Sequence, residues 1–241
     1  MFRHKGKGRT YYHNLQLASI LSFVAGVVNV TSVLALHVLT TNITGHFAYF
    51  AERLIDNQLK YAAIFLVYSI CFLGGAFVSN FSAETFSRKN ARLTYIIPLT
   101  IEICAIGAVM LLYARDVGDE AVLAGMLLFA MGVQNAMVTK VSQSVVRTTH
   151  LTGIFTDLGI ELSQLFFYKK VKSHRRLYRS IHLKIAIVCC FFAGGIIGGY
   201  GYKRVDLYIL CLAVAILFMA MIHDYIRYHY YIIKRSIRNR R

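Results

Sequence analysis

Three ionisable side chains, His150, Asp157 and Glu161, recur at helical spacing and are the first candidates for chemistry in this chain. Residues at these intervals fall on one face of an α-helix, which Gly153 and Gln164 share. An imidazole exchanges protons near neutral pH, and a carboxylate that moves between water and a drier pocket can gain and lose a proton. If the protein couples its activity to protons, we expect the exchange here, with Asp157 ranked first because it lies on the inward-pointing face. The alternative is that both acids are solvated at a membrane boundary.

Glu102 is a second candidate, because it lies near the middle of a long apolar run. A charge at the centre of a bilayer costs about 2.5–3.5 kcal/mol on insertion scales, and such residues often mark proton or ion routes. The only proline of the chain, Pro98, lies four residues earlier and predicts a helix kink. The alternative is a protonated Glu102 that forms a hydrogen bond with a neighbouring helix.

The residues around His150 form a threonine motif that the chain contains twice. Residues 40–47 and 148–155 both read T-T-x-[IL]-T-G-x-F, and the copies lie 108 residues apart. Two further matches occur in the same order: G-V-x-N at 26–29 and 132–135, and F-x-G-G at 72–75 and 192–195. This order predicts an internal duplication, with repeats at approximately 15–113 and 120–223 of a single domain, 1–241.

The two copies supply polar groups that we expect to line a substrate or ion pathway. Threonine and asparagine commonly cap helices, and the free N–H groups of a helix start can also hold an anion, so both roles stay open. Unpaired amides inside apolar runs cost free energy, which predicts that Asn29 and Asn135 face the interior. The expected pathway residues are Asn29, Thr41, Asn42, Thr44, Gly45, Glu102, Gln134, Asn135, Thr149, His150, Thr152, Gly153, Asp157 and Glu161.

The composition is that of a membrane protein. Apolar residues make up 57% and charged residues 16% of the 241 positions, against about a quarter charged in soluble domains. Apolar runs of roughly 20 residues are long enough to cross a bilayer as helices. We expect an all-α polytopic membrane protein with six transmembrane helices, at 15–36, 61–81, 93–113, 120–140, 183–202 and 205–223.

The basic residues predict how this protein lies in the membrane. The net charge of +16 would suggest a nucleic-acid partner in a soluble chain, but here lysine and arginine flank the apolar runs, so the expected partner is the lipid bilayer. Of the 27 basic residues, 22 fall on the side of the two termini, which places both ends in the cytoplasm. Three spans per repeat make the second repeat enter the membrane upside down, a plan typical of secondary transporters.

Amphipathic helices are expected after the first and fourth spans, over residues 42–58 and 150–168. Surface helices usually carry a lysine- and arginine-rich polar face, whereas the polar face of 150–168 carries two carboxylates and a histidine, so we expect this helix to pack against the bundle or line a cavity. Whether they re-enter the membrane is open.

Other features predict packing rather than chemistry. The five cysteines lie in apolar runs without metal-site spacing, and no catalytic or phosphate-binding motif occurs, so we expect no enzyme, metal or cofactor. The fifth span contains two overlapping G-x-x-x-G patterns, at Gly194 to Gly198 and Gly195 to Gly199. Such glycines allow close helix packing, either within the chain or in a homo-oligomer.

The segments Met131–Ala136, Val145–Gly153 and Thr156–Glu161 resemble the YoaK family of small bacterial membrane proteins, a family of unknown function. Asn42–Gly45 is a second match, although His46 stands where the family usually has a small or polar residue. The resemblance implies a six-helix protein of the bacterial inner membrane and brings no established activity.

Two functions are compatible with these patterns. The first is a secondary transporter, with proton coupling as one version, for a small polar or anionic solute. The second is a non-transporting membrane protein, either an assembly or regulatory partner or a small intramembrane enzyme that uses His150, Asp157 and Glu161.

Overall fold

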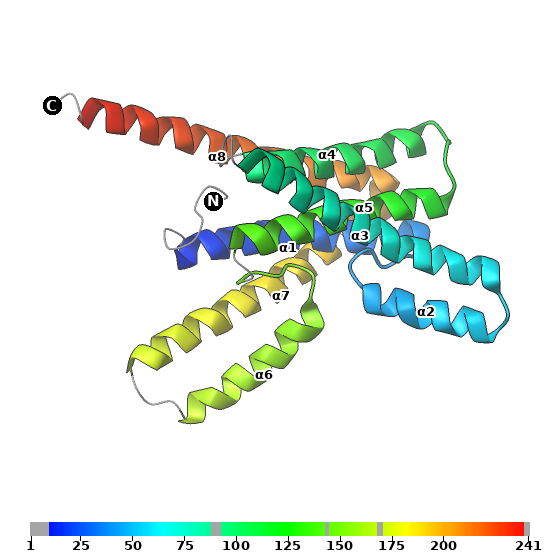
Figure 1. Cartoon of the computed structure of the whole chain (residues 1–241), viewed down its shortest axis with the longest axis horizontal. Coiled ribbons are helices and arrows are strands. Elements are labelled where there is room, and N and C mark those ends of the chain that lie inside the picture. The colour runs from blue at the N-terminus through cyan, green and yellow to red at the C-terminus, as the bar shows by residue number, and fades with distance from the viewer. Residues whose placement is uncertain (1–9, 88–92, 143–144, 168–170, 239–241) are drawn as a thin grey trace.

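The computed structural model describes residues 10–87, 93–142, 145–167 and 171–238, and all regular structure in these ranges is helical, as expected (Figure 1). The elements are α1 (Tyr11–Leu36), α2 (Ile43–Ile55), α3 (Leu59–Ser87), α4 (Leu93–Ala114), α5 (Glu120–Ser142), α6 (Leu151–Phe167), α7 (Val171–Val205), the short 3-10 helix η2 (Asp206–Ile209) and α8 (Leu210–Arg238).

Five helical stretches among the described residues are long and apolar enough to cross a membrane. The first four are α1, residues 59–86 of α3, α4 and α5, and each corresponds to one predicted span. The last two predicted spans fall in one apolar stretch of 51 residues, His174–Asp224, which contains α7, η2 and most of α8. The chain is therefore built as a multi-pass integral membrane protein.

Several helices are longer than the apolar runs that predicted them. α7 begins at Val171, twelve residues before the expected start at 183, and α8 continues well beyond 223 to Arg238. In the added part of α7, Leu177 and Ile181 are buried among basic neighbours. An apolar run marks the part of a helix that fits the hydrocarbon, whereas the helix itself continues as long as its backbone hydrogen bonds do.

The helices α1 and α5 form the interior of the bundle. Two thirds of the apolar window of each, 67%, is buried, against 22% for α3, 33% for α4 and 28% for the stretch containing α7 and α8. The outer helices expose large apolar side chains such as Leu73, Phe77 and Phe192, which suits contact with lipid. The helices that begin the two predicted repeats are therefore the ones shielded from the bilayer.

Glycines bring α1 into backbone contact with α7. A Cβ added at Gly26 would lie 2.0 Å from the carbonyl oxygen of Phe191, and one at Gly194 would lie 2.1 Å from that of Phe23. No larger residue fits at either glycine unless the helices separate. Tyr11 contacts His182 near the start of both helices, and Leu34 lies against Gly199 further along, so α1 and α7 run parallel.

The same device joins α5 to α3. A Cβ at Gly132 would lie 2.1 Å from the carbonyl oxygen of Phe72, and one at Gly75 would lie 2.0 Å from that of Phe129. In both helix pairs, each glycine meets the phenylalanine three positions before its partner glycine. In these contacts Gly75 corresponds to Gly194, whereas the sequence alignment of 72–75 with 192–195 pairs Gly75 with Gly195. The two alignments differ by one residue because the close approach of the backbones, rather than residue identity, sets the register.

Figure 1 shows two further helices lying outside the bundle, each beside a longer one. α2 folds back against α3, and α6 folds back against α7, so that two hairpins project from opposite ends of the molecule (Figure 1). The expected amphipathic helices thus pack on one neighbour each, while Phe47 of α2 and Phe155 of α6 stay more than half exposed.

Replacing Gly75 by alanine should destabilise the bundle, whereas replacing its neighbour Gly74 should not. The new methyl of Gly75→Ala would overlap Phe129, and overpacking of this kind typically costs about 1–3 kcal/mol. A Cβ at Gly74 meets nothing within 4 Å, so Gly74→Ala should gain helix propensity, up to about 1 kcal/mol. Thermal unfolding in detergent, followed by circular dichroism, measures both. Equal midpoints for the two variants would contradict the backbone contact.

Candidate functional site

A buried amide ties the turn after α1 back onto that helix. The Asn29 side-chain oxygen accepts hydrogen bonds from the Thr41 hydroxyl at 3.0 Å, the Thr41 backbone N–H at 3.3 Å and the Thr40 hydroxyl at 3.4 Å. Thr40 is fully buried and Asn29 nearly so. We call these three residues the first clasp.

The second copy of the motif forms the equivalent second clasp, from Gln134, Asn135, Thr148 and Thr149. The Thr149 hydroxyl donates to the side-chain oxygen of Asn135 at 2.7 Å. The Gln134 amide nitrogen lies 3.4 Å from the Thr148 hydroxyl and also donates to the backbone carbonyl of Leu21 in α1, at 3.0 Å. The second clasp therefore joins α5 to its own turn and to α1.

The clasps explain why amides and paired threonines recur together in the sequence. A buried polar group needs a hydrogen-bond partner, and within each copy the amide and the threonines provide partners for one another. Five of the expected pathway residues thus lie in two separate clusters rather than in one lining: Asn29 and Thr41 in the first clasp, and Gln134, Asn135 and Thr149 in the second. Thr44 and Thr152 are exposed and belong to neither clasp.

The rest of the motif shapes the start of a helix. The Asn42 side chain accepts a hydrogen bond from the Gly45 N–H at 3.1 Å and so caps α2. At the matching place before α6, the ring of His150 lies over Gly153, where a Cβ would come within 2.4 Å of it. The glycine leaves room for the preceding polar side chain to fold over the first helical turn. This supports the capping role of Asn42, since the N–H at Gly45 is already occupied.

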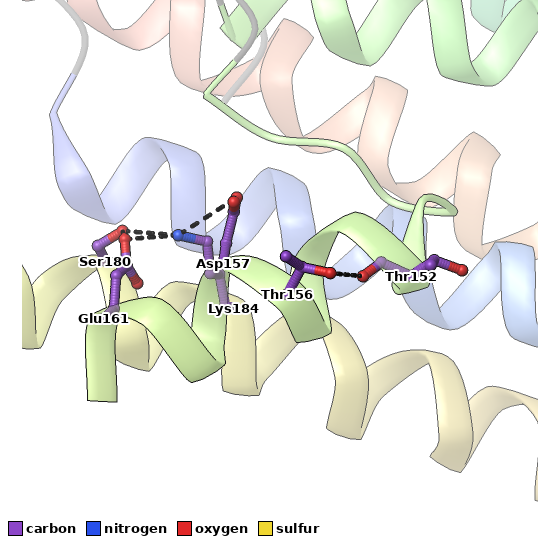
Figure 2. A network of polar contacts seen from close by, with 6 residues as sticks. All are labelled: Thr152, Thr156, Asp157, Glu161, Ser180 and Lys184. Carbon is purple, nitrogen blue, oxygen red and sulfur yellow. Dashed lines mark hydrogen bonds and ion pairs between the residues drawn. The ribbon is translucent and has the colours of Figure 1, made fainter. Parts of the chain in front are cut away.

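The two acids of α6 pair with a lysine of α7, as Figure 2 shows. The Lys184 ammonium lies 2.6 Å from the Glu161 carboxylate and 3.7 Å from that of Asp157. The Ser180 hydroxyl donates to the same Glu161 oxygen at 2.6 Å. The Lys184 and Glu161 side chains are 16% and 17% exposed, whereas that of Asp157 is 61% exposed. Glu161 is thus firmly held, and Asp157 lies at the rim.

This arrangement changes the ranking of the predicted acids. Asp157 was expected to lead because its face points inward, but most of its side chain is exposed and its ion pair is loose. Exposed pairs of this kind contribute little stability. Sequence reasoning missed Lys184, although a single lysine inside an apolar run was a signal that an acid must lie nearby. His150 is exposed and lies outside this network.

The matching hairpin, α2 with α3, is held by aromatic rings instead of charges. Tyr49 stacks on Phe65 with ring centroids 5.2 Å apart, and His46 contacts Tyr68 edge to face at 5.5 Å. Gly75 of α3 and Gly194 of α7 are equivalent positions 119 residues apart, and the same spacing makes Phe65 of α3 equivalent to Lys184 of α7. One packing position therefore carries a stacked aromatic pair in one copy and an ion pair in the other.

Glu102 lies wholly inside the bundle, on the buried stripe of α4 that also contains Leu99 and Ile106. Neither carboxyl oxygen has a hydrogen-bond partner among the described residues. The expected alternative, a hydrogen bond to a neighbouring helix, is therefore not formed. Leaving a buried polar group unpaired costs about 1–3 kcal/mol, so Glu102 weakens the fold that contains it.

Two sizeable grooves lined by described residues are apolar. One, of about 630 Å³, lies between α3, α4 and α5 beside Ile64, Met126 and Phe129. The other, of about 370 Å³, follows α1 and α7 beside Leu34, Phe192 and Gly199. Neither is bounded by a clasp. Within the described ranges, no three His, Cys, Asp or Glu side chains are grouped closely enough to hold a metal ion.

Comparison with known proteins adds a family and no function. Searches of curated proteins and of solved structures found no match. A family described as "Protein of unknown function (DUF1275)" matches residues 17–223, which include both clasps, all of α6 and Glu102. The matched region is the one that resembles YoaK proteins, and the match establishes a family of unknown function but does not confirm the YoaK name. The chain thus belongs to the DUF1275 family.

Proposed function

We propose that this protein is a secondary transporter for a small polar or anionic solute, with the two clasps as its gates. The observation that carries the proposal is that each copy of the motif fastens the turn after its own buried helix with an amide and threonines. Alternating access needs two equivalent closures on opposite sides of a central site, each able to open while the other stays shut. A clasp of a few hydrogen bonds, each worth about 1 kcal/mol, is weak enough to open in such a cycle.

The proposal includes six crossings, with a turn between α7 and α8. At 1.5 Å per residue, 51 helical residues would be more than twice as long as the roughly 30 Å hydrocarbon core. Asp206, at the corner, has a left-handed backbone with φ of 55° and accepts a hydrogen bond from Tyr113 at the end of α4. Cys211 then lies 3.4 Å from Met110, so α8 runs back beside α4.

Inverted repeats agree with the helix directions. α1 runs parallel to α7, and α3 runs parallel to α5, since Cys71 lies by Gly125 at one end and Glu84 binds Lys140 at the other. α1 begins and α8 ends at the same end of the bundle (Figure 1), which suits an even number of crossings. With the basic residues inside, the first clasp faces outward, the second clasp faces the cytoplasm, and both termini are cytoplasmic in a bacterial inner membrane.

Cysteine labelling tests this topology. In a variant without native cysteines, a cysteine at Asp116 or at Lys203 should react with an impermeant maleimide added outside intact cells, whereas one at Lys172 should react only after the membrane is opened. Lys203 lies at the end of α7, just before the corner at Asp206. Its exposure outside would show that α7 crosses completely, so that α8 has to cross back. If neither Asp116→Cys nor Lys203→Cys reacts with the maleimide in intact cells, the inverted arrangement is wrong.

Glu102 is the residue we propose for coupling transport to protons. It is buried without a hydrogen-bond partner among the described residues, and Pro98 interrupts the hydrogen bonds of the same helix one turn earlier. A carboxyl group that meets water in one state and a dry pocket in the other takes up and releases a proton as the states alternate. Asp157 is less suited, because it is largely exposed and already lies near Lys184.

The two acids should therefore respond differently to neutralisation. In liposomes with an imposed pH gradient, Glu102→Gln should reduce accumulation of the solute at least tenfold, because the proton carrier is gone. Asp157→Asn, the matched control, should stay within about twofold of the parent, as expected for an exposed pair. Gradient-driven accumulation by Glu102→Gln at the parent rate would remove Glu102 from the mechanism.

An untargeted comparison of metabolites tests transport itself. Cells that produce the protein should accumulate or lose at least one small polar solute relative to cells without it. Asn135→Leu removes the acceptor of Thr149 and so opens the second clasp. This variant should abolish the difference in metabolites, although it reaches the membrane in normal amounts. Identical metabolite profiles for cells with and without the protein would argue against transport.

A second candidate function, as an assembly partner, has one observation in its favour. The groove along α1 and α7 is largely apolar and open to the surface, which suits contact with a helix of another protein or of a second copy. The glycines of α7 are mostly used inside the chain, where Gly194 and Gly198 lie against α1. A homo-oligomer through this span would therefore have to use the groove side, at Gly199 and Phe192.

A further inference from the structure

We infer that His46 is a positioning residue that keeps the first clasp shut and lets it open when the imidazole gains a second proton. The inference deepens the proposed function, because it rests on the role of the first clasp as a gate.

His46 is bonded to the connector that carries the clasp threonines. Its Nε2 lies 2.7 Å from the carbonyl oxygen of Leu39, the residue directly before Thr40 and Thr41. A carbonyl only accepts, so Nε2 carries the proton and donates it. The hydrogen bond holds residues 39–41 between α2 and the end of α1, where both threonines reach Asn29.

The imidazole is enclosed on its other sides. His46 is 3% exposed, with Phe65 stacked on it at 6.1 Å and Tyr68 edge-on at 5.5 Å. Its second nitrogen, Nδ1, is buried and has no hydrogen-bond partner among the described residues. The pocket therefore fits a neutral ring with one donor and has no acceptor for a second N–H.

Other titratable groups around this pocket do not offset a positive charge on His46. On α2, Tyr49 faces Phe65, and on α3 the neighbour is Tyr68. The acids that act on the pocket are Asp119 and Glu120 before and at the start of α5, and they act on Tyr68. Among the described residues, the one hydrogen bond of the His46 side chain is with the Leu39 carbonyl. A protonated ring would thus bring an unpaired N–H and a charge into an apolar pocket.

The direction of the pH effect follows from the burial. Burial lowers the pKa of His46 below the ordinary value for histidine, and the hydrogen bond to Leu39 offsets this only in part. A base whose pKa is lowered by folding stabilises the folded arrangement fully above its ordinary pKa, and this contribution is lost as the pH falls through the lowered value. The first clasp should therefore be shut at neutral pH and loosen in acid.

The second copy of the motif lacks this device. Ile154 takes the place of His46, is also buried, and cannot donate a hydrogen bond. The residue matching Leu39 is Arg147, before Thr148 and Thr149. The histidine hydrogen bond to the connector is thus confined to the first clasp, which faces outward in the proposed topology. The second copy serves as an internal control in the same molecule.

Hydrogen–deuterium exchange of the full chain in lipid nanodiscs tests the inference without a known solute. Protection factors, which correct for the intrinsic effect of pH on exchange, are compared for residues 38–46 and 146–154 at about pH 8 and about pH 5. Protection of 38–46 should fall at least fivefold in acid, the factor that corresponds to about one lost hydrogen bond. Protection of 146–149, the part of the second segment that precedes His150, should not change.

Two substitutions separate protonation from simple loss of packing. His46→Gln keeps an N–H donor that does not titrate, so protection of 38–46 should stay high at both pH values. His46→Ile copies the second repeat, so protection should be low at both. The inference is wrong if 38–46 responds to acid equally in the parent and in His46→Gln, or does not respond in the parent. If acid lowers the protection of 38–46 as expected but no solute uptake is found, the role of His46 in the first clasp stands and the transport proposal fails.

Discussion

Backbone contact at four glycines is the constraint on which the rest of this structure depends. Gly26 and Gly194 join α1 to α7, and Gly132 and Gly75 join α5 to α3, each with a carbonyl oxygen where a side chain would otherwise be. In a bilayer, helices gain little from burying apolar surface, so dispersion contacts at close approach largely decide which helices pair. These contacts place α1 and α5 inside the bundle, so the polar side chains of these helices, such as Asn29 and Gln134, are buried there as well.

Once those polar groups are inside, each needs a partner. The clasps provide partners locally, by turning the chain after α1 and α5 back onto the helix that has just ended. The same turns set where α2 and α6 begin, with a polar side chain folded over a glycine in the first helical turn. Packing, hydrogen bonding and helix capping thus meet within one short segment in each half of the chain, from Gly26 to Gly45 and from Gly132 to Gly153.

The two halves differ where the outlying helices meet the bundle. α6 is attached to α7 by Lys184 between two acids, whereas α2 is attached to α3 by stacked rings and by His46. An ion pair and an aromatic stack fill the same position but respond differently to pH and salt.

The sequence alone determined the membrane class, the first four spans and the recurring polar motifs from which both clasps are built. These are local properties: apolar runs, and polar groups at a recurring spacing within one segment. The tertiary structure decided which helices pair, because that depends on glycines far apart in the sequence, Gly26 with Gly194 and Gly75 with Gly132. It also decided that Lys184 pairs with Glu161, that His46 reaches Leu39, and that no residue in the described part of the chain pairs with Glu102. Partners on other helices become neighbours only when the backbones have met, so spacing along one chain segment does not reveal them.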